Sequence, residues 1–410
     1  MTTIFKMGAA ALVLAGSTML GTLGASAAAQ EISWIYCGDK LDKTHDKYIK
    51  AWEEKNPDWK IAVEVVGWAQ CQDKATTLAA AGTPPAIAYV GSRTLKEFAD
   101  NDMIVEVPMT DEEKAAYFPH VVETVTYDGT QWGVPVALST KVLYWNKDLF
   151  KQAGLDPEQP PRTWAEEIEF AKIIKEKTGI PGYGLSAKTF DNTVHQFLHW
   201  VYTNDGKILD DKGEVVMDNP QVLAALKAYN DIKAYSQEGP TAYEQNEVRA
   251  IFLDGKVAMI QGGSGAAVRL QDSKFNWGIA TLPVGPDAKG SGTLVITDSL
   301  AVFKDSGVEE KAAEFAKYIT SPAIQEEYEL ATDEGLTPMR PSPAVDKVMV
   351  DIPYWRPLIE GIQYGGAEPL FTDWRGFQNV MISMVQSVVT GDAKPEAALT
   401  KATEELKNLK

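Results

Sequence analysis

The chain has 410 residues, of which 45% are hydrophobic and 23% are charged, and its formal net charge is -18. Because a single hydrophobic core stops growing at about 250 to 300 residues, this length predicts two lobes with a core each and a cleft between them. The negative charge argues against nucleic acid and anionic lipid as partners, and no segment beyond the N-terminus is apolar for long enough to cross a bilayer.

The N-terminus predicts export. Lys6 precedes an apolar, glycine-interrupted run, and small residues fit signal-peptide cleavage after Ala27 or Ala29. A buried N-terminal helix is the alternative. No cysteine follows the small residues directly, so we expect no lipid anchor. Residues 1–29 are therefore expected to be a signal peptide, and the mature protein to be free in the periplasm of a Gram-negative cell.

The only two cysteines are Cys37 and Cys71, and each lies just past a strand-like run. Neighbouring parallel strands bring their carboxyl ends together, and an oxidising compartment lets such thiols pair. We expect a disulfide, with two free thiols as the alternative.

Strands and helices alternate along the first part of the chain. Strands are expected at 32–36, 61–66 and 86–90, with helices at 43–54 and 73–81 between them. This alternation is typical of an α/β fold with a largely parallel sheet, in which ligands bind at the carboxyl ends of strands. The cleft candidates at these ends are Gly38, Asp39, Trp68, Gln70 and Arg93.

The middle of the chain begins with an expected strand at 142–145 and a short helix that Gly154 ends. Thr163 and Glu166 then have the spacing of a capping box, which predicts a longer helix from Trp164 up to a glycine stop at Gly179.

The remaining elements follow from turn and periodicity signals. A helix is expected at 190–202, a hairpin at 207–217 and a further helix after Pro220. Beyond these we expect a strand pair at 293–304 with Asp298 at its bend, a helix at 308–320 and a mostly helical end from 354 to 410.

Several segments carry a family resemblance. They are 80–90, 131–135 with 141–164, 252–265, 277–283 and 334–340. In this order they resemble the family 1 extracellular solute-binding proteins of carbohydrate ABC importers, the maltose-binding-protein-like group. The chain departs from the family pattern at Ala86, where the family usually carries Asp.

The resemblance implies a two-lobed periplasmic-binding-protein fold, each lobe a mostly parallel sheet flanked by helices, with hinge crossovers near Thr140, Gly290 and Pro338. The implied N-terminal lobe comprises 30–140 and 291–338, and the C-terminal lobe comprises 141–290 and 339–410. Hinge closure around a ligand belongs to this class of protein.

A sugar site should combine planar hydrogen-bonding groups with aromatic rings that pack on C-H faces. For any single tryptophan, a place in the core is the more frequent alternative. Asp298 and Arg340 are expected in the site from their family positions at the crossovers. The expected ligand contacts are Asp39, Trp68, Gln70, Arg93, Tyr144, Trp200, Gly263, Ser264, Asp298, Arg340, Trp355 and Trp374.

Enzyme-like signals are weaker. His195 and His199 have metal-ligand spacing, but Gln196 stands where a zinc protease carries its catalytic Glu. The glycines around Ser264 suggest a dinucleotide fingerprint, yet Val268 replaces its third glycine. A glycosidase carboxylate pair is not marked by any pattern. We expect no catalytic residue, no metal and no cofactor.

The expected function is that of a monomeric receptor that carries a carbohydrate or sugar-like solute to inner-membrane ABC permease subunits. One alternative is a receptor for an anionic sugar derivative, such as a sulfonate, uronate or glycerophosphodiester, for which Arg93 or Arg340 would be the bidentate donor. A secreted carbohydrate-active enzyme is the other alternative.

Overall fold

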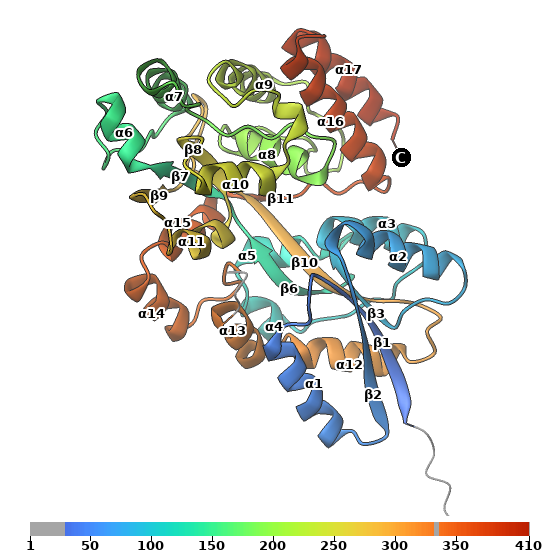
Figure 1. Ribbon diagram of the computed structural model, residues 1–410. Coiled ribbons are helices and arrows are strands. Elements are labelled where there is room, and N and C mark those ends of the chain that lie inside the picture. Colours follow the sequence, from blue (N-terminus) through green and yellow to red (C-terminus); the bar gives the residue numbers. More distant parts are fainter. Residues whose placement is uncertain (1–28, 332–335, 410) are drawn as a thin grey trace, which may run out of the picture.

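The computed structural model describes residues 29–331 and 336–409, which form two lobes joined by crossing strands (Figure 1). The expected signal peptide, apart from Ala29, lies outside the described residues. Glu334 and Gly335, in the segment expected at the third crossover, also lie outside them.

The first lobe contains a mixed six-stranded sheet in the order β11-β10-β3-β1-β2, with β6 also paired to β10. β1 runs parallel to β2 and β3, whereas β10 runs antiparallel to β3 and β6. The strands are β1 (Gln30–Cys37), β2 (Trp59–Val66), β3 (Ile87–Gly91), β6 (Val134–Ser139), β10 (Leu294–Val302) and β11 (Gly366–Ala367).

The strand pair expected at 293–304 is instead one strand, β10. Its register with β6 shifts between Asp298 and Ser299. Such an irregularity bends a strand without ending it, so the polar residue that suggested a turn lies inside a continuous ladder.

Helices and one short hairpin surround this sheet, and its core includes the fully buried Trp34 and Phe315. The elements are α1 (Lys43–Lys55), α2 (Trp68–Ala80), η1 (Ser92–Thr94), α3 (Leu95–Asp100), α4 (Asp111–Ala115), α5 (Pro119–Glu123), β4 (Thr126–Tyr127), β5 (Thr130–Gln131), α12 (Glu309–Ile319) and α13 (Pro322–Ala331). α2 begins at Trp68, five residues before the expected start at 73, because the residues after Gly67 include no helix breaker.

The second lobe contains a three-stranded sheet, β8-β7-β9, built from β7 (Val142–Asn146), β8 (Met259–Gly262) and β9 (Trp277–Ala280). The two-lobed α/β fold is confirmed, but the expectation of a mostly parallel sheet in this lobe is wrong. β7 pairs antiparallel with both neighbours. β7 leads away from the first lobe, and β8 and β9 both run back towards it.

Helices cover the sheet of the second lobe and make up most of its mass (Figure 1). Two expected helix signals are confirmed: the Thr163 and Glu166 capping box opens α7, and Gly154 ends α6 with a left-handed φ of 82°. The helices are α6 (Lys147–Ala153), α7 (Trp164–Thr178), α8 (Asp191–Tyr202), α9 (Pro220–Lys233), η2 (Pro240–Ala242), α10 (Gln245–Leu253), α11 (Ser264–Leu270), α14 (Pro343–Asp351), α15 (Trp355–Glu360), η3 (Gly361–Tyr364), α16 (Trp374–Thr390) and α17 (Pro395–Lys407).

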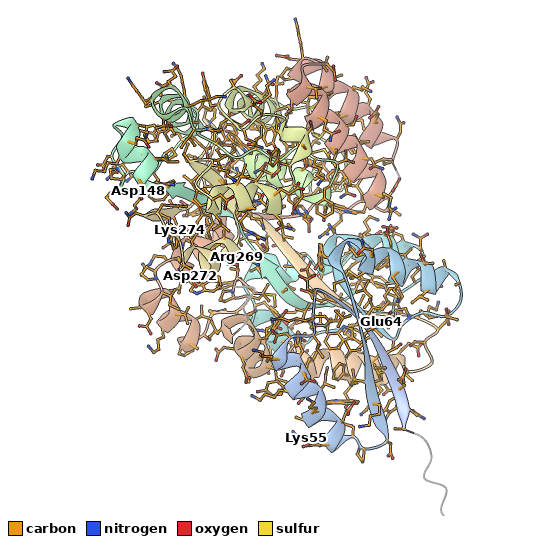
Figure 2. All side chains as sticks on the ribbon, in the orientation of Figure 1. Lys55, Glu64, Asp148, Arg269, Asp272 and Lys274 are labelled. Carbon is orange, nitrogen blue, oxygen red and sulfur yellow. A yellow bond between two sulfur atoms is a disulfide. The ribbon has the colours of Figure 1, made fainter. Side chains whose placement is uncertain are left out.

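Charged side chains lie on the outside of both lobes. Figure 2 shows Lys55, Glu64 and Asp148 at the surface, and all three are exposed. Within 29–331 and 336–409, no helix combines the length and the hydropathy that a membrane span needs.

Candidate functional site

A cavity of about 750 Å³ lies between the two lobes. α2 and α3 of the first lobe face α8 and α16 of the second lobe across it (Figure 1). Its aromatic lining includes Trp68 and Trp374, and its remaining lining is mostly polar. The polar lining residues are Gln72, Asp73, Thr76, Thr77, Thr94, Glu97, Thr189, Asp191, Arg375, Gln378 and Asn379.

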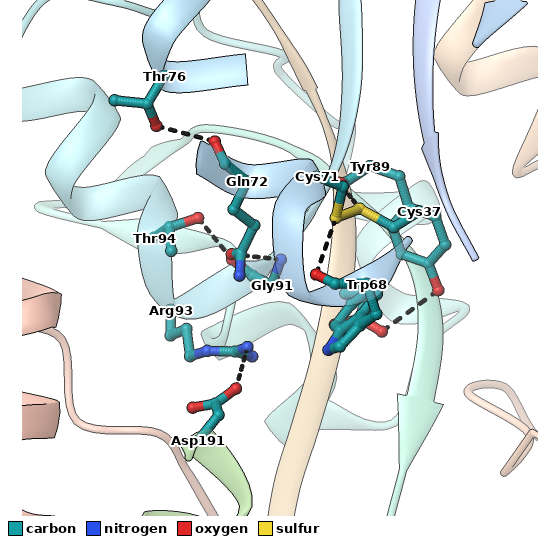
Figure 3. Close-up of a disulfide and its surroundings, with 11 residues drawn as sticks. Cys37, Trp68, Cys71, Gln72, Thr76, Tyr89, Gly91, Arg93, Thr94 and Asp191 are labelled. Carbon is teal, nitrogen blue, oxygen red and sulfur yellow. Dashed lines mark hydrogen bonds and ion pairs between the residues drawn. A yellow bond between two sulfur atoms is a disulfide. The ribbon is translucent and has the colours of Figure 1, made fainter. Parts of the chain in front are cut away.

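α2 forms much of the first-lobe wall of the cavity and is fixed to the sheet in three ways (Figure 3). A disulfide joins Cys71 in α2 to Cys37 at the end of β1, with Cα atoms 5.6 Å apart. Gln72 accepts a hydrogen bond from the backbone N-H of Gly91 at 3.2 Å. The Trp68 ring packs edge to face against Tyr89, with ring centroids 5.7 Å apart. The side chains that α2 presents to the cavity are therefore held in place before any ligand arrives.

Arg93, in η1, reaches from the first lobe to the second. Its side chain is 1% exposed, and Nη2 donates to a carboxylate oxygen of Asp191 at 2.6 Å, while Nη1 lies 3.6 Å from Glu368. The guanidinium also lies 5.6 Å from the ring centroid of Trp374. Burial alone would lower the pKa of Arg93, but the charges of Asp191 and Glu368 raise it above its ordinary value.

The two carboxylates that pair with Arg93 have further partners in the second lobe. Glu368 lies 2.6 Å from Nε2 of His195, and Asp191 accepts a hydrogen bond from Gln378 at 3.1 Å. Burial opposes ionisation of Asp191, but the positive charge of Arg93 outweighs it and lowers the pKa of Asp191. Asp191 therefore stays ionised, and Arg93 is held between two negative charges.

Asp298 lies in β10, within electrostatic reach of Arg93. It accepts a hydrogen bond from the Tyr89 hydroxyl at 3.2 Å. Burial raises the pKa of Asp298 to about 7. The negative charge of Glu368 also raises it, whereas the positive charge of Arg93 lowers it. Near neutral pH this carboxyl can therefore donate a hydrogen bond as well as accept one.

Two contacts closer to the surface also join the lobes. Arg375 in α16 pairs with Asp73 in α2, and both side chains are more than half exposed. The Thr372 hydroxyl donates to the Asp100 carboxylate. Together with the Arg93 pair, these contacts hold the two walls of the cavity together.

The structure brings four of the expected ligand contacts to this region. Trp68 and Trp374 line the cavity, Arg93 pairs with the lining residue Asp191, and Asp298 lies within electrostatic reach of Arg93.

Two of the expected aromatic contacts are corrected, because their rings are enclosed in the second lobe. Trp200 is fully buried and packs against Trp164 and Tyr229. Tyr144 is also fully buried, and its hydroxyl donates to the backbone carbonyl of Gly263 at 2.9 Å.

The third aromatic contact and the arginine expected at the crossover also lie elsewhere. Trp355 is 5% exposed and packs in a separate core cluster of the second lobe. The Arg340 guanidinium stacks on Tyr117 at 3.8 Å, beside a smaller cavity of about 320 Å³. Neither Arg340 nor Tyr117 is among the residues that line the interlobe cavity.

The last four expected contacts also lie outside the lining of the interlobe cavity. Asp39 and Gln70 are exposed to solvent. Gly263 directly follows β8, close to Lys141, and Ser264 is buried at the start of α11.

None of the polar lining residues was among the ligand contacts expected from the sequence, although a signal for some of them exists. Gln72 and Thr76 are four apart in α2, and Arg375 and Asn379 are four apart in α16, so each pair lies on one helix face. A polar stripe on a helix is usually solvated, and only the facing lobe makes these stripes into a cavity wall.

The histidines with metal-ligand spacing have structural partners. His195 contacts Glu368, whereas Nδ1 of His199 accepts a hydrogen bond from the backbone N-H of Leu294 at 3.0 Å. Among the described residues, no cluster of three or more potential ligands could hold a metal ion.

Comparison with known proteins identifies the family. Residues 39–326 match the family of bacterial extracellular solute-binding proteins. A binding protein of Brucella abortus is 28% identical over 403 residues, which cover 95% of this chain and 95% of that protein. The sn-glycerol-3-phosphate-binding periplasmic protein of Pectobacterium atrosepticum is 25% identical over 421 residues, which cover 94% and 92% of the two chains.

The fold comparison agrees. An ABC transporter solute-binding protein of Thermotoga lettingae, solved with α-D-tagatose, superimposes with a TM-score of 0.79 at 26% identity and covers 92% of this chain and 99% of its own. Since the family match extends over well more than half of the sequence and these relatives align along almost its whole length, the chain belongs to the bacterial extracellular solute-binding protein family.

Proposed function

We propose that this protein is the periplasmic receptor of an ABC importer and that it binds a sugar or polyol in the cavity between its lobes. The observation that supports this most is the lining of that cavity. The half-buried Trp68 ring and the small exposed part of Trp374 offer apolar surface for sugar C-H groups, and amide, hydroxyl and carboxylate side chains offer partners for sugar hydroxyls. The family consists of binding proteins, which argues against the enzyme alternative.

Binding would shift the molecule towards a conformation in which the lobes are closed around the ligand. Such a shift requires that the ligand bind the closed state more tightly than the open state. Contacts from both α2 and α16 to one ligand meet this condition, because they exist together only when the lobes approach. The lobes would be 30–140 with 291–338, and 141–290 with 339–410.

The same proposal covers location and partners. The N-terminal signal expected in residues 1–29 would direct the protein to the periplasm, where the closed receptor docks on the membrane permease. We expect a monomer, and the net charge of -18 disfavours nucleic acid.

The test is a thermal-shift and calorimetry panel on the mature protein. It includes α-D-tagatose, maltose, ribitol and sn-glycerol 3-phosphate, the last as a probe for the anionic alternative that the glycerol-phosphate-binding relatives suggest. A ligand that binds only the folded state at a thousandfold excess over Kd stabilises that state by about 4 kcal/mol. A shift with any panel member supports a receptor, and unchanged melting with every member contradicts the proposal.

A pair of variants locates the binding. Trp68→Ala should weaken binding of the panel hit by about tenfold, because stacking on the ring is lost. Val350→Ala is the control, since Val350 is an apolar residue that is 68% exposed and lies outside the cavity lining. Equal affinities in both variants would place the ligand elsewhere.

A further inference from the structure

The lining of the interlobe cavity has more acidic than basic side chains. Among the described lining residues the carboxylates are Asp73, Glu97 and Asp191, and the only Lys or Arg side chain is Arg375. A cavity in which one sign of charge prevails raises the local concentration of ligands of the opposite sign and lowers that of ligands of the same sign.

The cations near the cavity are already neutralised. Arg375 pairs with Asp73, and Arg93 lies between Asp191 and Glu368. A phosphate or carboxylate on a ligand would have to displace one of these carboxylates from its guanidinium. The displaced carboxylate is part of the cavity wall and would stay close to the ligand, so the like charges would remain near each other.

Glu97, in α3, is the lining carboxylate that these pairs leave uncompensated. Among the described residues, no hydrogen bond or ion pair to its side chain is found. Burial raises the pKa of Glu97, and the neighbouring negative charge of Asp373 raises it further, while Arg375 opposes both effects. The side chain is partly buried and is surrounded by more negative than positive charge.

In its ionised form the Glu97 carboxylate only accepts hydrogen bonds, and because its pKa is raised, this form prevails towards higher pH. The hydroxyl groups of a sugar or polyol, and an ammonium group still more strongly, are the donors that suit Glu97. We infer that the cavity selects sugars or polyols that carry no acid group, and that Glu97 sets this selectivity by accepting hydrogen bonds from the ligand and by repelling anions. This inference rests on the proposed receptor function, and it separates this chain from its glycerol-phosphate-binding relatives.

The experiment compares matched neutral and phosphorylated probes by calorimetry. The pairs are α-D-tagatose with tagatose 6-phosphate, ribitol with ribitol 5-phosphate and glycerol with sn-glycerol 3-phosphate. In every pair that binds, the neutral compound should bind at least about tenfold more tightly than its phosphate ester. Glu97→Gln should reduce this ratio by about tenfold, and the control Glu112→Gln, an exposed acid in α4, should leave it unchanged.

The outcomes separate the two proposals. Tighter binding of a phosphate ester than of its neutral counterpart would overturn the selectivity while supporting a receptor. A neutral-to-phosphate ratio that is the same in wild type and Glu97→Gln would overturn the role of Glu97. If no probe binds, the receptor proposal itself fails, and this inference fails with it. Circular dichroism of each variant shows that a loss of binding is not a loss of folding.

Discussion

Replacing Arg93 with alanine removes the cation that joins the inner ends of the two lobes. In the wild type, the Arg93 side chain is 1% exposed and pairs with Asp191 at 2.6 Å, and Glu368, 4% exposed, lies at 3.6 Å. The variant leaves the buried Glu368 and the partly buried Asp191 without that cation, although Glu368 keeps His195 and Asp191 keeps Gln378 as partners.

Removing one partner of a buried ion pair costs about 3 to 5 kcal/mol, because the remaining charge is left uncompensated. The partners that remain, and the 15% exposure of Asp191, favour the lower end of that range. Arg375→Ala is the matched control. It breaks a second Arg to Asp pair between the same lobes, but its side chains are 69% and 60% exposed, and such pairs contribute about 0 to 1 kcal/mol.

Denaturant unfolding of the three proteins gives the difference in the free energy of unfolding, and small-angle scattering gives the separation of the lobes. We expect Arg93→Ala to lose about 3 kcal/mol or to show a larger radius of gyration, and Arg375→Ala to resemble the wild type. Equal effects of the two variants, or no effect of Arg93→Ala on either quantity, would refute the reasoning from burial.

Three further predictions concern the supports of the site and the core. Gly91→Ala should mimic Arg93→Ala in scattering, because a Cβ at Gly91 would overlap the Arg93 guanidinium; an unchanged profile would contradict this. Replacing both Cys37 and Cys71 with serine should lower the free energy of unfolding by about 3 to 4 kcal/mol, because their disulfide closes a loop of 34 residues. The melting temperature of the variant should be lower than that of the wild type, and adding a reductant should not lower it further. Burial raises the pKa of Glu167 to about 8, so the folded state holds a proton that the unfolded state has lost between pH 4.5 and 8. The contribution of Glu167 to the free energy of unfolding is therefore complete below pH 4.5 and is lost as the pH rises to 8. Glu167→Gln should therefore gain stability over the wild type between pH 4.5 and 8, by up to a few kcal/mol; a constant difference across that range would contradict the assignment.

Much of the fold could be predicted because its signals are local. Glycine stops and a capping box act within a few residues, so the start of α7 and the end of α6 were readable from Thr163, Glu166 and Gly154. The alternation of strands and helices likewise predicted two α/β lobes. The direction of the strands in the second sheet could not be predicted from the sequence, because it depends on the tertiary path by which the chain brings β8 and β9 alongside β7.

The site was less predictable, because aromatic residues look alike in a sequence. Trp200 and Trp374 both lie in second-lobe helices beside polar residues. α8 packs on α9 and α16, which encloses Trp200 completely, whereas Trp374 begins α16 and lines the cavity although it is only 6% exposed. Helical periodicity identifies the face on which a side chain lies, but it does not tell what covers that face.

The sequence alone therefore determined the element types, the caps and the class of protein, because those depend on neighbouring residues and on motif order. Only the tertiary structure decided the charge arrangement of the site. Arg93 meets Asp191 across 98 positions of sequence, and it meets Glu368 from still farther along the chain. Such contacts exist only where two separately folded lobes approach, and no local pattern of residues encodes that approach.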